Sequence, residues 1–279
     1  MRNKALSFVL FLTLLCAMAL PIRAGQSSPA PLASSTFSAP PALPDVATLL
    51  KQVQKNQDRL EQDRERYSFT EVEEQDSVSR KGQVKAGNVN QYDVFFLRGY
   101  LIRRLVKKDG KSLSAAAQKK EDGRVRKLVE KYERKAEKKN NKQDDSEVGV
   151  GVFLRTSLFT HPRWEWLGGR RVLAFDFHPN PDYRPQTLVE KMVYCLAGEA
   201  WIDAQAREVV RLQAGFDSSY KIAGGLLASI EKGTTVTLAQ TFVDGDAWLP
   251  SYFSIHARGR LLLFKGVRMN LEDHFSDYR

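Results

Sequence analysis

The feature that most constrains the fold is a period-two stretch near the middle of the chain, Gly198–Phe216. A β-prone run at 199–203 and a polar break at 204–207 are followed by apolar residues at alternate positions. Such alternation is typical of a half-buried antiparallel strand. The stretch therefore predicts a β-hairpin, with the alternate residues on one face: Val210, Leu212, Ala214 and Phe216.

Similar strand patterns occur along most of the chain. Alternating or β-branched runs lie at 67–77, 84–97, 101–106, 172–177, 234–243, 248–255 and 261–269. Turn signals separate several of them, including Asp244-Gly245 and a predicted turn at Gly259. These patterns predict an α+β fold that is mainly antiparallel β.

Three segments favour helices. Apolar residues recur at helical spacing from Val46 to about Arg64, and Asp45 before them is a residue type that favours the N-cap position. Residues 148–160 do not alternate cleanly, so a helix is predicted there. Gln186–Ala197 is amphipathic, with Gly198 as its predicted C-cap.

The N-terminus has the layout of a cleaved secretory signal over residues 1–24. Arg2 and Lys4 precede an apolar run, and Ala24 offers a small residue for cleavage. Residues 25–44 are rich in Pro, Ser and Ala and predict a flexible tether. Cleavage near Ala24 lowers the net charge from +10 to +7 and leaves Cys195 alone, without an internal disulfide.

A strongly basic segment interrupts the strand patterns. From Arg103 to Lys142 there are sixteen Lys and Arg against six Asp and Glu. A narrow apolar stripe and Ser114 as a cap predict a basic helical insertion at about 107–147. The insertion is either a solvated element lying on the sheet or a helix attracted to an anionic membrane surface. The membrane version assigns contacts to Lys119, Lys120, Arg124, Lys127, Lys131 and Lys135. The charge alone would permit binding to nucleic acid, but nucleic acid is a poor partner for an exported chain, so none is predicted.

The sequence offers little local chemistry. Its four histidines are scattered, no His/Cys/Asp cluster has metal-ligand spacing, and no hydrolase motif occurs. These observations predict a protein without metal, cofactor or catalytic residues. Carboxyl groups brought together from distant positions would be the exception, because hydrolases assemble such pairs in space.

Aromatic residues give a second class of site. A curved sheet that does not fill its concave face leaves an apolar pocket. The alternative for each aromatic is an ordinary place in the core. The candidate ligand-binding residues are Trp164, Trp166, Phe175, Phe177, Trp201, Phe216, Phe242, Trp248 and Phe253.

Short motifs give the chain a family resemblance. Val46-Ala47-Thr48-Leu49-Leu50, Trp201-Ile202-Asp203, Val209-Val210-Arg211-Leu212 and Trp248-Leu249-Pro250 resemble the LolA-like superfamily of periplasmic lipoprotein-sorting carriers. The resemblance implies one domain over 45–279: a curved, incomplete β-barrel closed by helices, with acyl chains in its apolar cavity. It also implies a periplasmic location. The basic insertion departs from the simple carrier pattern.

Three functions follow as hypotheses. The first is a periplasmic carrier or binder for the acyl chains of lipoproteins or lipids, without chemistry. The second is a non-transporting envelope sensor or interaction protein with a packed sheet and a membrane-docking basic helix. The third is a hydrolase, which requires a cleft with two close acids and a strongly perturbed pKa.

Overall fold

The structure is a computed structural model that describes residues 42–79, 81–138, 149–225, 228–243, 247–261 and 265–279. Its strands are β1 Ser68–Val78, β2 Val84–Leu97, β3 Tyr100–Lys108, β4 Lys111–Ser112, β5 Ser157–Leu167, β6 Arg170–Pro179, β7 Leu196–Asp203, β8 Glu208–Phe216, β9 Tyr220–Ile222, β10 Ala228–Ile230, β11 Thr235–Val243, β12 Ala247–Leu261 and β13 Lys265–Ser276. Its helices are α2 Val46–Asp63, α3 Ala115–Lys138, α4 Val150–Thr156 and α5 Leu188–Val193, with 3-10 turns η1 Arg64–Arg66 and η2 Ala223–Gly225.

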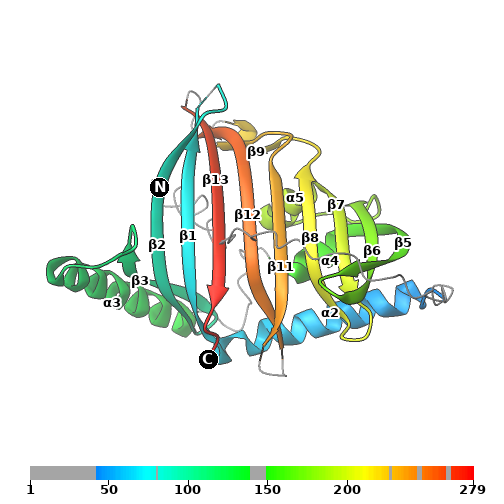
Figure 1. Cartoon of the computed structure of the whole chain (residues 1–279), viewed down its shortest axis with the longest axis horizontal. Helices are drawn as coiled ribbons and strands as arrows, with labels where there is room; N and C mark the ends of the chain where they lie inside the picture. The colour runs from blue at the N-terminus through cyan, green and yellow to red at the C-terminus, as the bar shows by residue number, and fades with distance from the viewer. Residues whose placement is uncertain (1–41, 80, 139–148, 226–227, 244–246, 262–264) are drawn as a thin grey trace, which may run out of the picture.

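The strands form one large antiparallel sheet in the order β4-β3-β2-β1-β13-β12-β11-β8-β7-β6-β5, with β9 and β10 attached beside β12 (Figure 1). The predicted fold class, mainly antiparallel β with helices, is confirmed. The sheet is open, however: within the described ranges β4 pairs only with β3, and β5 only with β6. Helices α4 and α5 lie at the β5–β8 end, and α2 runs from that end along the sheet towards β12, so the helices do not close a barrel (Figure 1).

The first helix matches its prediction closely. Helix α2 runs from Val46 to Asp63, where the sequence predicted Val46 to about Arg64. Asp45 caps it, because its Oδ1 accepts from the Ala47 amide at 3.2 Å and its Oδ2 accepts from the Thr48 hydroxyl.

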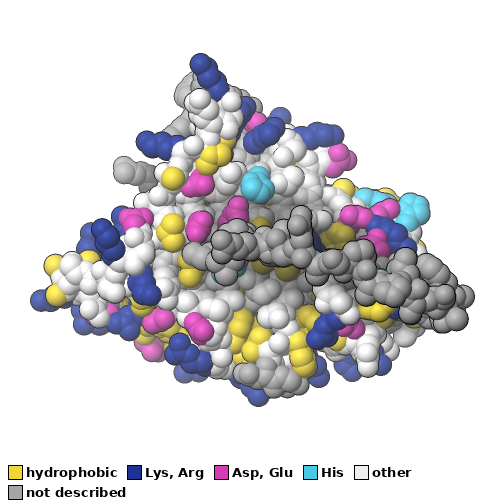
Figure 2. Space-filling model, in the orientation of Figure 1, with side chains coloured by type: hydrophobic (Ala, Val, Ile, Leu, Met, Phe, Trp, Pro, Cys, Tyr) yellow, Lys and Arg dark blue, Asp and Glu magenta, His cyan; other side chains and the backbone are white. Residues whose placement is uncertain are grey.

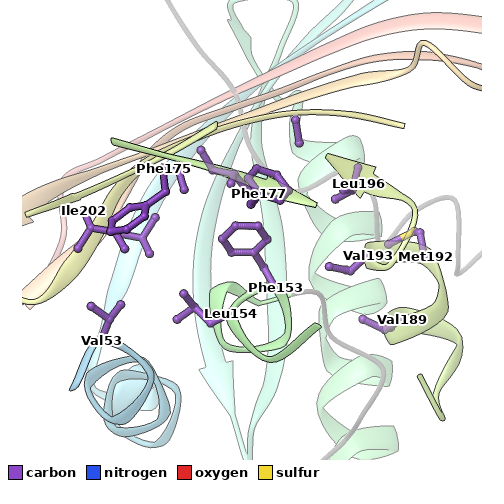
Figure 3. Close-up of a cluster of buried hydrophobic side chains, with 14 of the residues drawn as sticks. Val53, Phe153, Leu154, Phe175, Phe177, Val189, Met192, Val193, Leu196 and Ile202 are labelled. Carbon is purple, nitrogen blue, oxygen red and sulfur yellow. The ribbon is translucent and has the colours of Figure 1, made fainter. Parts of the chain in front are cut away.

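The main core lies between these helices and strands β6–β8. Val53 of α2 faces Phe175 and Ile202, and Phe153 of α4 packs edge-on against Phe177 at a ring-centroid distance of 4.6 Å (Figure 3). Phe175 and Ile202 are fully buried. Burial of large apolar side chains from both layers fixes the helices on the sheet.

The central hairpin is confirmed, but its facing pattern is not the predicted one. Leu212, Ala214 and Phe216 lie in the main core, whereas Val210 belongs to a separate cluster with Trp201. A bulge explains the difference. The strand register shifts between Trp201 and Ile202, so that Val210 is the extra residue and Val209 takes its place in the core.

Two glycines predicted as caps or turns lie inside strands. Helix α5 ends at Val193, and Gly198 is part of β7; a Cβ there would lie 2.0 Å from the Gln213 carbonyl oxygen. Gly259 lies within β12, where a Cβ would lie 2.2 Å from the Ser229 oxygen. Both positions need glycine because a neighbouring strand approaches closely.

The helix predicted at 148–160 is only partly correct. Helix α4 covers Val150–Thr156, and the chain then enters strand β5 at Ser157. Strand β5 carries an irregularity between Thr160 and Arg163, and His161 there has a positive φ of 50°. The segment does not alternate cleanly because its first half is the helix α4 and only its last residues belong to β5.

The basic helix forms where it was predicted. Helix α3 packs on β3 with the Tyr132 ring stacked on Tyr100 at 4.4 Å. Glu121 accepts the Leu105 amide at 2.8 Å, and Asp122 pairs with Arg104 at 2.9 Å. The helix therefore lies on the edge of the sheet through its half-buried stripe.

Several predictions fall outside the described residues: the signal peptide at 1–24, nearly all of the tether at 25–44, and the Asp244-Gly245 turn. Among the helices of the described ranges, none combines the length and apolarity needed to cross a membrane.

Candidate functional site

One face of the sheet carries both the main core and the unusual polar groups. Directly opposed residues in antiparallel strands project from the same face. The register aligns Leu212, Leu238, Phe253, Asp273 and Glu73 across five neighbouring strands. Because Leu212 belongs to the main core, we call this the inner face. Its β5–β8 half is apolar, and its β1–β3 half carries charge.

The charged half contains three buried acids and one arginine, here called the acid cluster: Glu71, Glu73, Asp273 and Arg103. Glu71 and Asp273 are fully buried, and Glu73 is 5% exposed. Arg103 donates from Nε to Glu71 at 2.8 Å and from Nη2 to Glu73 at 2.8 Å. Its guanidinium lies 3.9 Å from the Tyr92 ring centre, and the Tyr92 hydroxyl lies 3.3 Å from Glu73 Oε1. Arg103 thus forms charged hydrogen bonds with two of the three acids.

Asp273 is the acid with which Arg103 forms no hydrogen bond. Neither of its carboxylate oxygens has a donor within the described structure. The Glu71 carboxyl group is its neighbour, and a hydrogen bond between them requires a proton on one of the two. Burial, and then the charge of Glu71, raises the pKa of Asp273 to about 11, and burial raises the pKa of Glu71 to about 7.

A cleft of about 420 Å³ lies where the C-terminal half of α2 meets the sheet. We call it the helix-end cleft. Its volume falls in the range of small-molecule sites. Its lining is part apolar and part charged: Asn56, Arg59, Leu60, Asp63, Arg66, Tyr67, Ala206, Glu208, Phe242, Ala247 and Trp248.

Local contacts build the wall of this cleft. Asn56 donates to the carbonyl oxygens of Ala206 at 3.3 Å and Arg207 at 3.2 Å, which ties α2 to the β7–β8 turn. Gln57 donates to the buried Glu208 carboxyl group, and burial raises the pKa of Glu208 to about 7. Phe242 remains 45% exposed beside Trp248, so the cleft presents apolar surface to solvent.

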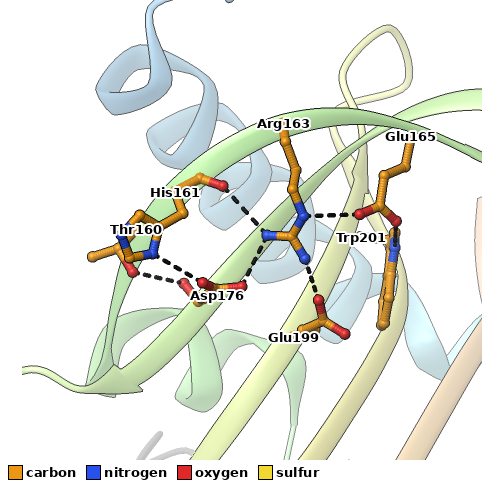
Figure 4. A network of polar contacts seen from close by, with 7 residues as sticks. All are labelled: Thr160, His161, Arg163, Glu165, Asp176, Glu199 and Trp201. Atoms are coloured by element: carbon orange, nitrogen blue, oxygen red, sulfur yellow. Dashed lines mark hydrogen bonds and ion pairs between the residues drawn. The ribbon is translucent and has the colours of Figure 1, made fainter.

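The opposite face of the sheet carries an exposed charge network (Figure 4). Arg163 of β5 donates to Glu165 at 2.8 Å and to Asp176 at 2.8 Å, and it also pairs with Glu199. Trp201 Nε1 donates to Glu165 at 2.8 Å. These groups satisfy one another, and the network holds β5, β6 and β7 together.

The predicted aromatic residues do not gather around one space. Phe175, Phe177 and Phe216 are buried in the main core, and Trp164 packs against it. Trp201 and Trp248 belong to the second apolar cluster, which includes the bulged Val210. Phe242 and Trp248 line the helix-end cleft, Phe253 is half-buried, and Trp166 is 70% exposed. The ligand-binding role of these residues stays a prediction.

The six predicted membrane-facing cations are all exposed on α3: Lys119, Lys120, Arg124, Lys127, Lys131 and Lys135. Figure 2 shows basic side chains gathered at the end of the molecule where α3 lies. Arg124 is engaged with Glu121 at 2.6 Å and with the Arg103 carbonyl oxygen. Lys135 lies 5.1 Å from the Tyr100 ring centre. Lys131 lies 5.5 Å from the Tyr132 ring centre, and Lys119, Lys120 and Lys127 are exposed to meet an anionic surface.

The acid cluster was not identified from the sequence, although a weak signal was present. Asp273 lies between Leu271 and Phe275 at two-residue spacing, and both neighbours are buried. An acid in the apolar phase of a strand requires a partner. The other members of the cluster come from β1 and β3, about 170 to 200 residues earlier in the chain.

Neither a protein-family model nor a curated protein matches this sequence. Solved structures of similar fold include a candidate outer membrane lipoprotein-sorting protein domain from Vibrio parahaemolyticus, with 11% identity, a TM-score of 0.34, and coverage of 82% of this chain and 92% of that one. A LolA superfamily protein from Nitrosomonas europaea aligns at 9% identity and a TM-score of 0.28, covering 84% of this chain and 92% of that one.

MucB, solved in complex with the periplasmic part of MucA, aligns at 8% identity with a TM-score of 0.21, covering 83% of this chain and 94% of that one. Because every TM-score is below 0.5, no function is taken from these likenesses. The structural matches are to LolA superfamily proteins and MucB, at low sequence identity and over most of the chain.

Proposed function

We propose that this protein is an exported, periplasmic binder or carrier for the acyl chain of a lipoprotein or lipid. The observation that carries the proposal is the helix-end cleft, a space of about 420 Å³ where Leu60 of α2 and the rings of Phe242 and Trp248 lie among polar and charged side chains. The family resemblance of the sequence points to the same class of ligand. Binding would be driven by removing apolar surface from water, worth about 25 cal/mol per Å².

The cleft also has groups suited to the polar end of an amphiphile. Arg59 and Arg66 lie on its lining, where they can meet a carboxylate or phosphate. Asp63 pairs with Arg66 at 3.9 Å, and Glu208 is held by Gln57. Because the lining combines apolar rings with two arginines, as an amphiphile requires, we propose binding rather than hydrolysis.

Replacing Phe242 by alanine is expected to weaken the binding of a fluorescent fatty acid about tenfold, because the exposed ring would be covered by the ligand. Leu188→Ala is the matched control, since Leu188 is 56% exposed on α5 and does not line the cleft. Fluorescence titration of both variants measures the difference. Equal affinity for Phe242→Ala and the wild type would exclude the cleft as the binding site.

A second candidate function is membrane docking through α3, favoured by the exposure of its cations while its apolar stripe rests on β3. In this version, the protein is an envelope sensor or interaction protein and the sheet holds no ligand. Membrane docking differs from the acyl-chain function because it requires an anionic surface and does not involve binding of an acyl chain.

Charge reversal at Lys119, Lys127 and Lys131 is expected to abolish sedimentation with phosphatidylglycerol vesicles at low salt, since each basic residue near an anionic surface contributes about 1 kcal/mol. The control reverses three exposed lysines elsewhere, Lys51, Lys55 and Lys191. Vesicle binding that falls equally in both variants would reflect net charge only and would contradict docking through α3.

A further inference from the structure

We propose that Glu71, Glu73 and Asp273 bind one divalent metal ion of the calcium type on the inner face of the sheet. The three residues come from adjacent strands, β1 and β13, and Glu73 and Asp273 are directly opposed in the register. One carboxylate oxygen from each lies within 4.8 Å of the others. The inference is independent of the acyl-chain function, because the helix-end cleft has a different lining.

With all three acids ionised, the cluster lacks positive charge, which either a bound proton or a metal ion must supply. Arg103 supplies the one guanidinium of the cluster and bonds only Glu71 and Glu73, and Tyr92 adds a neutral hydroxyl beside Glu73. Removing unpaired carboxylates from water costs several kcal/mol each. A divalent ion would bring three carboxylates and one arginine to neutrality.

The unpartnered Asp273 is the second observation that points to a ligand. It is fully buried, and neither oxygen accepts a hydrogen bond from the described residues. Buried carboxylates in proteins are almost always paired or bound to metal. Asp273 lies against the same two acids that Arg103 holds in place, so its free oxygens complete a three-carboxylate donor set.

The donor set selects the class of metal. All three ligands are carboxylate oxygens, which suit Ca²⁺, Mg²⁺ and Mn²⁺, whereas Zn²⁺ and Cu²⁺ sites usually include His or Cys. Ca²⁺ binds oxygen at about 2.3–2.6 Å and accepts irregular geometry. Two of its ligands can therefore lie up to about 5 Å apart, which accommodates the spacing within 4.8 Å.

The test is a titration of the full chain, purified in chelator and transferred to metal-free buffer. Added Ca²⁺ is expected to raise Tm by about 5–10 °C at a hundredfold excess over Kd. Tb³⁺ in place of Ca²⁺ is expected to show emission sensitised by Tyr92, whose hydroxyl lies 3.3 Å from Glu73. Excess Ca²⁺ should then displace Tb³⁺ and quench the emission.

Variants locate the site. Asp273→Asn and, separately, Glu73→Gln are expected to lower the affinity for Ca²⁺ at least tenfold and to remove the Tb³⁺ emission. Glu208→Gln is the control, because Glu208 is a buried acid outside the cluster and should leave both readouts unchanged. The proposal is overturned if Ca²⁺ and Tb³⁺ leave the wild type unchanged, or if their effects persist in both cluster variants. In that case a shared proton balances the cluster.

Discussion

Replacing Arg103 by leucine is expected to lower the free energy of unfolding by about 3–5 kcal/mol in chelator-containing buffer, because the change leaves three buried acids without a counter-charge. The Arg103 side chain is 17% exposed, and those of Glu71 and Glu73 are 0% and 7% exposed. Water therefore cannot replace the lost pairing. Urea unfolding followed by circular dichroism measures the difference.

Arg104 provides the matched control on the same strand. Its ion pair with Asp122 is 40% and 51% exposed, and such pairs contribute about 0–1 kcal/mol. Arg104→Leu should therefore cost far less than Arg103→Leu. Equal losses, or a near-neutral Arg103→Leu, would mean that the buried acids are held in their neutral form and do not depend on the arginine.

The acid cluster also shows where sequence-based prediction ended. The absence of metal-ligand spacing argued against a metal site, and that argument considers only neighbours in the chain. Glu71 and Asp273 are separated by some 200 residues and meet because β1 pairs with β13. Long-range pairing of the first and a late strand is not encoded in a local pattern, so the cluster required the structure.

The positions of many strands and helices could be predicted well, because the local periodicity of apolar residues indicates them. Helix α2, strand β2 and the β7–β8 hairpin follow their patterns nearly residue by residue. The face on which each side chain lies was less predictable, because one extra residue in a strand breaks the alternation at that point. The bulge at Val210 exchanged the core positions of Val209 and Val210, and neither side chain is polar enough to mark the change.

The ligand pocket was the feature that the sequence predicted least well. Aromatic content alone does not say whether rings fill a core or line a space. Phe177 packs on Phe153 of α4 and Phe175 on Phe159 of β5, and both rings are buried in the core. Phe242 and Trp248 face the end of α2 instead, because the β11–β12 pair extends past the main core. Only the relative position of helix and sheet separates these outcomes.

The second large effect on stability is expected from replacing Gly198, which lies where β7 and β8 approach closely. Gly198→Ala should lower the free energy of unfolding by about 1–3 kcal/mol or more, since overpacking against an atom that cannot move is costly. The new methyl group would lie 2.0 Å from the Gln213 carbonyl oxygen and 2.9 Å from Ala214 Cα. Both are backbone atoms of β8. The clash could be relieved only by displacing β8, and Leu212 on that strand is part of the main core.

Gly215→Ala on the facing strand of the same hairpin separates this clash from the general cost of losing a glycine. A Cβ at Gly215 would meet only the Thr234 oxygen, at an ordinary contact distance of 3.9 Å. Its substitution should be neutral or slightly stabilising, because alanine restricts the unfolded chain. Thermal unfolding of the two variants side by side is the measurement. If both lose stability equally, close strand approach is not the reason for glycine at 198. If only Gly198→Ala does, that residue is required by the β7–β8 pairing and not by the end of α5.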